Sequence, residues 1–249
     1  MIDTYWLGFL DMERKLLFQE ELFQNLITSA RSGAPANDSL IFAEHPPCFS
    51  IQKDTNLQFV KNRSLFERVT KDGRVPIIKM HRGGSITYHG PGQLVVSSVL
   101  NLTACGLKSV EEYFLLLERI CIAILQEYGV TGITGREGHA RGVWVEDPRW
   151  DTEPERKIVS LGTRCRAILT PETSIVSAYI VSGGFSLNIA TDLSYFSLIH
   201  PCGLIGRKAT SIKEVLGYIP PSKDIRELIC KLLANALDMP IALPMWRTI

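Results

Sequence analysis

A cysteine and a lysine far apart in the sequence have the residue types for acyl-transfer chemistry. Cys202 stands between Pro201 and Gly203, where the proline restrains the backbone before the thiol and the glycine leaves room after it. Lys157 opens the apolar segment KIVSLG. An ammonium beside a thiol favours the thiolate, and such a pair can take up an acyl group and shuttle its proton. Taken singly, however, a cysteine is more often a small buried hydrophobe and such a lysine an edge charge.

The segment HRGGSITYHGPGQ, residues 81–93, is the second candidate for a functional site. It contains neither GxxxxGK[ST] nor GxGxxG, and a strand is expected after it, so a phosphate loop is not favoured. A glycine-rich hairpin is the structural alternative. That alternative does not explain why polar side chains crowd the segment, namely Arg82, Thr87, Tyr88 and His89. We therefore interpret the segment as the wall of a pocket whose glycines give a ligand clearance.

Strands and helices along the rest of the chain must position these residues. Apolar periodicity predicts helices at 11–31, with Asp11 as the N-cap, at 110–130 and at 223–237, and a short helix from Ser211. Strands are predicted at 5–9, on either side of Pro46 and Pro47, and at 75–80, 93–102, 141–147 and 157–169, with a strand pair at 173–190. Cys202 is then expected at a strand–loop boundary. Strands without regular βαβ alternation predict the α+β class: a single domain, residues 1–249, with a mixed β-sheet flanked by helices.

Composition narrows the class of protein further. A net charge of +1, from 27 basic and 26 acidic residues, predicts no nucleic-acid or membrane-surface binding through bulk charge. No apolar run approaches the ~18 residues of a membrane helix. Six cysteines without a CxxC pair predict no metal site and indicate a reducing compartment. We expect a cytoplasmic protein, or an organelle matrix protein if a targeting segment was removed, with the other five cysteines in the core or partly buried.

Taken together, the segments resemble the lipoyl(octanoyl) transferase family from about residue 5 to about residue 215. The family's elements occur in the family's order: EHPP at 44–47, RGGxxTYHGPGQL at 82–94, GVWV at 142–145, KIxSLG at 157–162, GFxLN at 184–188 and PCG at 201–203. The resemblance implies the fold of lipoate ligases and biotin protein ligases. It also implies octanoyl transfer from octanoyl-acyl carrier protein to a lysine of lipoyl domains, in 2-oxoacid dehydrogenase complexes or the glycine cleavage H protein. No ATP, metal or other cofactor is implied.

The resemblance also assigns roles to residues. Cys202 matches the acyl-accepting cysteine and Lys157 its partner lysine. The segments that line the acyl pocket match Arg82, Gly83, Gly84, Ser85, Ile86, Thr87, Tyr88, His89, Ser160, Leu161, Gly162, Gly184, Phe185 and Ser186. Backbone amides near Cys202 or at Gly162 are expected to hold the oxyanion, and Gly90 and Gly92 to let the acyl chain approach the main chain.

Two departures from the family pattern keep other functions open. Gly183 stands where most members carry a histidine, and SIQ at 50–52 replaces the family's TLG. The intact Cys/Lys pair predicts an active enzyme. The alternatives are a lipoyl or octanoyl amidotransferase, an ATP-dependent lipoate ligase of the same fold, and a non-catalytic acyl-binding module.

Overall fold

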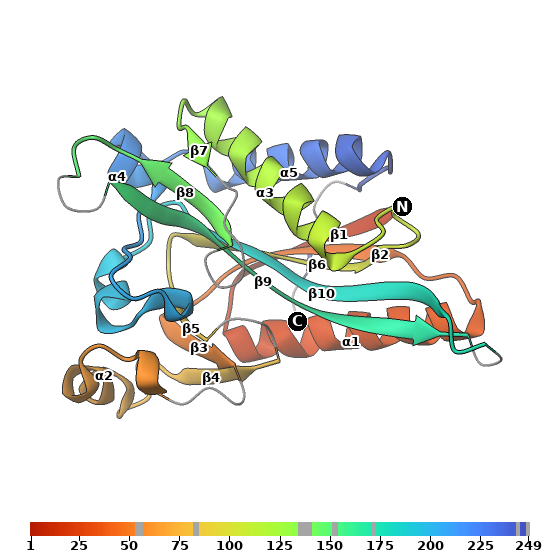
Figure 1. Cartoon of the computed structure of the whole chain (residues 1–249), viewed down its shortest axis with the longest axis horizontal. Coiled ribbons are helices and arrows are strands. Elements are labelled where there is room, and N and C mark those ends of the chain that lie inside the picture. The colour runs from red at the N-terminus through yellow and green to blue at the C-terminus, as the bar shows by residue number, and fades with distance from the viewer. Residues whose placement is uncertain are drawn as a thin grey trace.

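A mixed sheet forms the centre of the molecule (Figure 1). The computed structural model describes residues 1–52, 57–81, 85–133, 141–150, 154–170, 173–242 and 245–247. Within these residues the eight strands follow one another across the sheet as β11 (Met245–Trp246), β1 (Ile2–Phe9), β2 (Asp38–Glu44), β6 (Gln93–Asn101), β10 (Val176–Asn188), β9 (Glu155–Leu169), β8 (Gly142–Glu146) and β7 (Gly132–Ile133). Strand β1 runs parallel to its neighbours β11 and β2, and the other pairs are antiparallel.

A smaller sheet and its helices lie at one end of the large sheet (Figure 1). Strand β3 (Cys48–Gln52) is its centre, paired with β4 (Ile77–Met80) and β5 (Ile86–His89). Helix α2 (Arg63–Thr70) and the 3₁₀ segments η1 (Leu57–Phe59) and η3 (Leu193–Leu198) pack around a separate aromatic core that includes Phe49, Phe66 and Phe196. The glycine-rich segment therefore belongs partly to a strand, β5, and leads from the small sheet into β6 of the large one.

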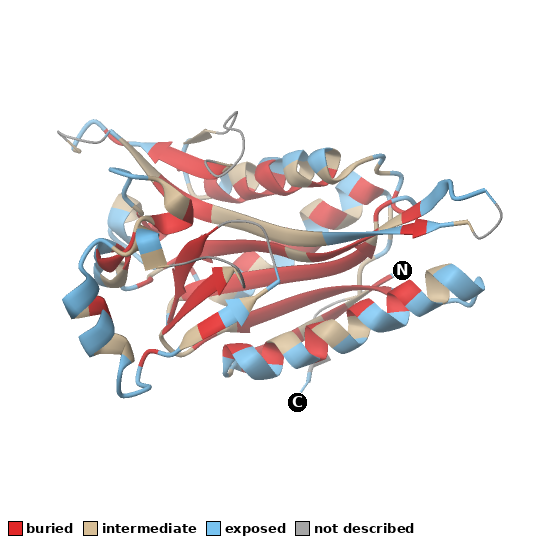
Figure 2. Ribbon diagram, turned by 60° about the horizontal axis from the view of Figure 1, so that its bottom comes forward, coloured by how far each residue is buried: buried red, intermediate tan, exposed pale blue. Residues whose placement is uncertain are grey.

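Helices cover both faces of the large sheet. Helices α3 (Val110–Glu127) and α5 (Ser222–Leu237) lie on one face, and α1 (Met12–Ser32) lies on the other (Figure 1). Successive side chains of a strand point to opposite faces, so β6 sends Val96 into the core under α3 and α5 and Val99 into the core under α1. Figure 2 shows the buried central strands and the alternation of buried and exposed residues along α1.

The predicted fold class, a mixed sheet flanked by helices, is confirmed, and so are the predicted long helices. The short helix α4 (Ile212–Leu216) begins where expected, because the Glu214 amide donates to the Ser211 hydroxyl at 3.2 Å. The Asp11 side chain, in contrast, makes no capping hydrogen bond to α1.

Cys165 is exposed on β9, and not in the core or partly buried as expected. Among the described residues, no helix combines the length and apolar character needed to cross a membrane.

The strand pair predicted at 173–190 is wrong, since β10 is one continuous strand. Gly183 and Gly184 lie in the middle of this strand. In the structure they allow neighbouring strands to pack closely: a Cβ at Gly184 would lie 2.4 Å from the carbonyl oxygen of Val96 in β6. A Cβ at Gly183 would lie 2.4 Å from the carbonyl oxygen of Gly162 in β9. The glycines therefore serve interstrand packing and do not turn the chain.

Candidate active site

The thiol of Cys202 and the amine of Lys157 meet in the folded chain. The Lys157 Nζ atom lies 3.9 Å from the Cys202 Sγ atom, and both side chains are buried. Cys202 occupies the middle of a single 3₁₀ turn, η4 (Pro201–Gly203), and not the strand–loop boundary that the sequence predicted. Its φ of 55° is in the left-handed region, which costs about 1–3 kcal/mol for a residue with a Cβ. The surrounding structure thus holds the thiol in a conformation that the sequence alone does not favour.

Lys157 is fixed by its backbone and by the space around its side chain. Its amide donates to the Lys208 carbonyl at 3.0 Å, and its carbonyl accepts from the Thr210 amide at 2.9 Å. The amine lies 5.6 Å from the centre of the Trp144 ring, a cation–π distance. Gly142, with φ of 138°, leaves room for the chain, because a Cβ there would lie 2.6 Å from Lys157 Cε. The side chain is therefore directed toward the thiol by residues of two segments, β8 and residues 208–210.

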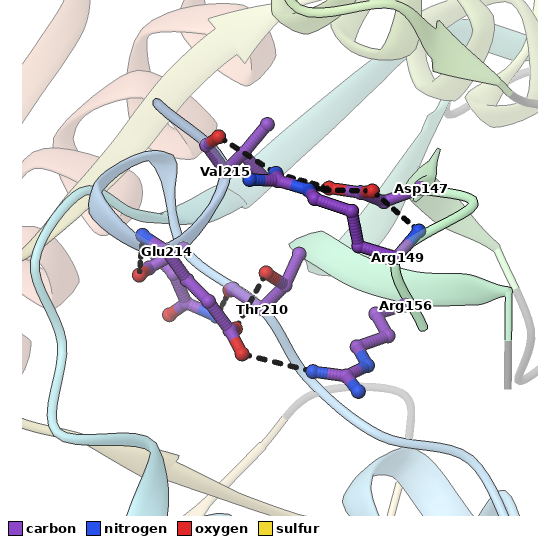
Figure 3. Close-up of polar contacts among 8 residues, drawn as sticks. Asp147, Arg149, Arg156, Thr210, Glu214 and Val215 are labelled. Carbon is purple, nitrogen blue, oxygen red and sulfur yellow. Dashed lines mark hydrogen bonds and ion pairs between the residues drawn. The ribbon is translucent and has the colours of Figure 1, made fainter. Parts of the chain in front are cut away.

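A polar network clamps the segment that flanks the lysine (Figure 3). The Glu214 carboxylate accepts from the Arg156 guanidinium at 2.8 Å and from the Thr210 hydroxyl at 2.7 Å. The Arg149 guanidinium donates to the Val215 carbonyl at 3.0 Å. These contacts join the β8–β9 region to α4 and to the residues before it. They hold the backbone on both sides of the lysine that meets the thiol.

A cavity of about 240 Å³ opens beside the Cys202 thiol, between α1, the large sheet and the small sheet. Eight of the residues predicted to bind substrate line it together with Cys202: Thr87, His89, Ser160, Leu161, Gly162, Gly184, Phe185 and Ser186. Leu161 and Phe185 also pack in the core under α3 and α5. The lining from α1 includes the apolar side chains of Met12 and Leu16. The surface of the cavity is thus mostly apolar and includes a thiol, as an acyl-chain site requires.

Of the remaining predicted substrate-binding residues, those that the structure describes do not line this cavity. Ile86 and Tyr88 point to the opposite side of β5, into the aromatic core of the small sheet, because strand side chains alternate. The Ser85 hydroxyl is buried near η4, 3.3 Å from where a Cβ on Gly203 would stand, and has no hydrogen-bond partner among the described residues. Arg82, Gly83 and Gly84 lie outside the described residues.

His89 joins the two sheets through a chain of side-chain hydrogen bonds. The Gln93 amide nitrogen donates to Asn188 at 2.8 Å, so the Gln93 oxygen is left to accept from His89 Nδ1 at 2.7 Å. With its proton on Nδ1, the imidazole accepts at Nε2 from the Ser50 hydroxyl at 3.0 Å. His89 therefore holds parts of the site in place. The four-residue spacing of His89 and Gln93 around a Gly-Pro-Gly turn was the available sequence signal for this contact.

The clearance that we expected at two glycines is taken up by the protein itself. A Cβ at Gly90 would lie 2.1 Å from the Tyr88 hydroxyl oxygen, and one at Gly92 would lie 2.7 Å from the Ala190 carbonyl. The predicted approach of an acyl chain to these two glycines is therefore wrong. Their role is to let the turn between β5 and β6 pack against its neighbours.

The amides expected to form an oxyanion hole next to Cys202 have other partners. The Gly203 amide donates to the His200 carbonyl at 2.9 Å, and the Leu204 amide donates to the Pro201 carbonyl at 3.1 Å.

At Gly183, where the family pattern has histidine, the φ of 141° and the contact with β9 leave no space for a side chain. The backbone itself thus accommodates this departure.

A cluster of polar side chains that the sequence analysis missed lines the cavity away from the thiol. We call it the Lys15 cluster: Lys15, Gln19, Ser97 and Ser182. The Lys15 amine, in a side chain only 2% exposed, donates to Gln19 Oε1 at 2.5 Å and to the Ser97 hydroxyl, and Gln19 Nε2 donates to the Ser182 hydroxyl at 2.7 Å. Burial lowers the pKa of the Lys15 ammonium to about 7. The sequence signal was position: Lys15 and Gln19 fall on the buried helical stripe of Met12 and Phe23.

Comparison with solved structures agrees with this architecture. The crystal structure of lipoate-protein ligase A bound with ATP superposes with a TM-score of 0.64 at 14% identity, covering 99% of this chain and 90% of that one. A bipartite lipoate protein ligase from Thermoplasma acidophilum gives a TM-score of 0.64 at 13% identity, covering 100% and 88%. At these identities the comparison establishes the fold.

Sequence comparison establishes the family. The chain belongs to the family of the lipoyl protein ligase A/B catalytic domain, whose model matches residues 11–234. It is 36% identical over 219 residues to an octanoyltransferase of Bacteroides fragilis, covering 88% of this chain and 90% of the relative. An octanoyltransferase of Flavobacterium johnsoniae is 32% identical over 242 residues, covering 94% and 96%. The chain is accordingly an acyltransferase of the octanoyltransferase kind that acts in lipoylation, which confirms the enzyme class predicted from its sequence.

Proposed function

We propose that the protein transfers an octanoyl group from octanoyl-acyl carrier protein to a lysine of lipoyl domains through a thioester on Cys202. The acceptors are lipoyl domains of 2-oxoacid dehydrogenase complexes or the glycine cleavage H protein. The observation that carries the proposal is the 3.9 Å approach of Lys157 Nζ to Cys202 Sγ beside an apolar cavity. The catalytic domain is residues 1–249.

In the first half-reaction the Cys202 thiolate attacks the thioester carbonyl of the donor. A Lys157 ammonium 3.9 Å from the sulfur favours the thiolate, because opposite charges attract each other at this distance. When the tetrahedral intermediate collapses, the bond from the carbonyl carbon to the donor sulfur breaks. Lys157 protonates the departing phosphopantetheine thiol and becomes a neutral amine.

In the second half-reaction the neutral ε-amine of the acceptor lysine attacks the octanoyl–Cys202 thioester. The new C–N bond forms as the bond to Cys202 Sγ breaks, and Lys157 accepts the proton lost by the nitrogen. The amide product is more stable than the thioester, so the reaction needs no ATP. Burial of the alkyl chain in the cavity contributes at most about 0.8 kcal/mol per methylene.

The state of the cysteines supports a reducing compartment. All six are free thiols, and Cys165 is exposed without a disulfide partner. Free thiols persist where the compartment keeps them reduced. We therefore propose the cytoplasm as the site of action.

The proposal is tested by assaying octanoylation of a purified lipoyl domain in the presence and absence of ATP. We expect octanoyl-lysine to form from octanoyl-acyl carrier protein without ATP. Product that required ATP and free octanoate or lipoate would identify a ligase instead. Transfer from an already modified carrier domain, but not from acyl carrier protein, would identify an amidotransferase.

A further inference from the structure

The proposed mechanism gives no task to the Lys15 amine, although it is buried in the wall of the acyl cavity. A buried lysine costs stability unless it is paired or bound. Among the described residues no carboxylate lies within ion-pair distance of Lys15, and its hydrogen-bond partners are two neutral groups, Gln19 and Ser97. A residue that costs stability and borders the substrate cavity is a candidate for substrate recognition.

The strand register places this amine away from the reacting sulfur. Ser97 of β6 pairs with Gly184 of β10, which pairs with Gly162 of β9. The Lys157 amine lies beside Gly142, which pairs with Ser160. Gly162 follows Ser160 by two residues, or about 7 Å along an extended strand. An acyl chain bound to Cys202 in the cavity would thus meet Lys15 with its distal carbons. The two glycines of this row contribute no side chain to compete for the space.

The hydrogen bonds of the Lys15 cluster are incomplete toward the cavity. As an ammonium, Lys15 has three donors, of which two are used, on Gln19 and Ser97, whereas the neutral amine has two donors and both are used. The Ser97 and Ser182 hydroxyls act as acceptors in these contacts and so keep their own protons for donation. A plain alkyl chain offers these donors nothing, and a buried donor without a partner weakens binding. A chain with an acceptor atom at this depth satisfies them.

We propose that the Lys15 cluster is a specificity-determining subsite that favours acyl chains carrying a hydrogen-bond acceptor on their distal carbons over unsubstituted chains of equal length. The inference rests on the proposed function, because it takes the cavity as the acyl site. The acceptor is an oxygen or a sulfur atom, since both accept from N–H and O–H donors. Lys15 acts on substrate choice, and the chemical step stays with Cys202 and Lys157.

Binding measurements test the subsite independently of catalysis. Dissociation constants of octanoyl-, 8-hydroxyoctanoyl- and 3-hydroxyoctanoyl-pantetheine are measured calorimetrically in the Cys202→Ala background, where the thioester stays intact. We expect the preference for the 8-hydroxy chain over the plain chain to fall about tenfold on Lys15→Met, in line with the loss of one hydrogen bond. The 3-hydroxy chain, with its oxygen near the carbonyl, should show no such change. Lys79→Met is the matched control, since Lys79 is an exposed lysine at the same cavity.

Ser97→Ala provides a second variant in case Lys15→Met does not fold, and it should reduce the same preference several-fold. A preference that stays within twofold in both variants would overturn the subsite, as would an equal effect on the 3-hydroxy chain. The two proposals fail separately. Octanoyl transfer with an unchanged preference removes the subsite and leaves the proposed function. A changed preference in a protein that transfers no acyl group supports the subsite and removes the proposed function.

Discussion

Replacing Lys15 by methionine should stabilise the protein near neutral pH, by an amount that depends on pH. Burial lowers the pKa of this ammonium from about 10.5 to about 7. Between these values the unfolded chain binds a proton that the folded chain does not, so the free energy of unfolding of the parent protein rises with pH. The shift corresponds to about 5 kcal/mol, lost in full at pH values below 7. Methionine removes this cost but leaves the Gln19 oxygen and the Ser97 hydroxyl without their hydrogen-bond partner, which lowers the free energy of unfolding by about 1–3 kcal/mol.

The assay is urea unfolding of the parent protein and the Lys15→Met variant at intervals from pH 7 to pH 10. The variant should gain about 2 kcal/mol at pH 7, and this gain should fall by about 1.4 kcal/mol for each pH unit above about 7.5. The Lys79→Met control removes a lysine at an exposed position of the same cavity and should not reproduce this gain. A stability difference for Lys15→Met that is flat across this range would refute the reasoning, because it would mean that the amine titrates as it does in water.

Two substitutions test the proposed role of Lys157 and the packing that positions its side chain. Lys157→Ala should lower the transfer rate about 10²–10⁴-fold while circular dichroism shows that the fold is intact. The control Lys213→Ala, at an exposed lysine, should leave the rate unchanged. Near-normal turnover by Lys157→Ala would remove Lys157 from the mechanism. Gly142→Ala should lose at least about 2 kcal/mol more unfolding free energy than Gly129→Ala and also lose activity. Both glycines have positive φ, but only at Gly142 would the Cβ meet Lys157, so equal losses in urea unfolding would contradict the packing argument.

Local rules predicted most elements of the fold because their signals lie within a few residues. Ser211 caps α4, and the stripe of apolar residues fixes α3. The same rules failed where contacts between distant segments decide the local structure. Gly183 and Gly184 have the composition of a turn, yet the backbones of β6 and β9 on either side hold them in a strand. Apolar character alone also misjudges burial in α1, because Leu17 is 73% exposed whereas Lys15 is 2% exposed.

The candidate site likewise combines features that have a local sequence signal with features that depend on distant contacts. The flanking proline and glycine indicate a presented thiol at Cys202, but its left-handed φ depends on contacts that no local pattern contains, such as the His200 amide donating to the Phe59 carbonyl. The approach of Lys157 to Cys202 spans 45 residues of sequence and was expected only from the family resemblance. Alternation along β5 separates Thr87 from Tyr88, a distinction that a matched segment does not make.

The central claim is that the Cys202 sulfur carries the octanoyl group. The most direct test is intact-mass analysis of the protein quenched in acid after incubation with octanoyl-acyl carrier protein and no acceptor. The account predicts one octanoyl adduct per chain that hydroxylamine removes, and no thioester adduct on the Cys202→Ser variant. An adduct that persists at the same level in Cys202→Ser and is cleaved by neutral hydroxylamine, as a thioester is and a serine ester is not, would contradict it and place the acyl group on another residue.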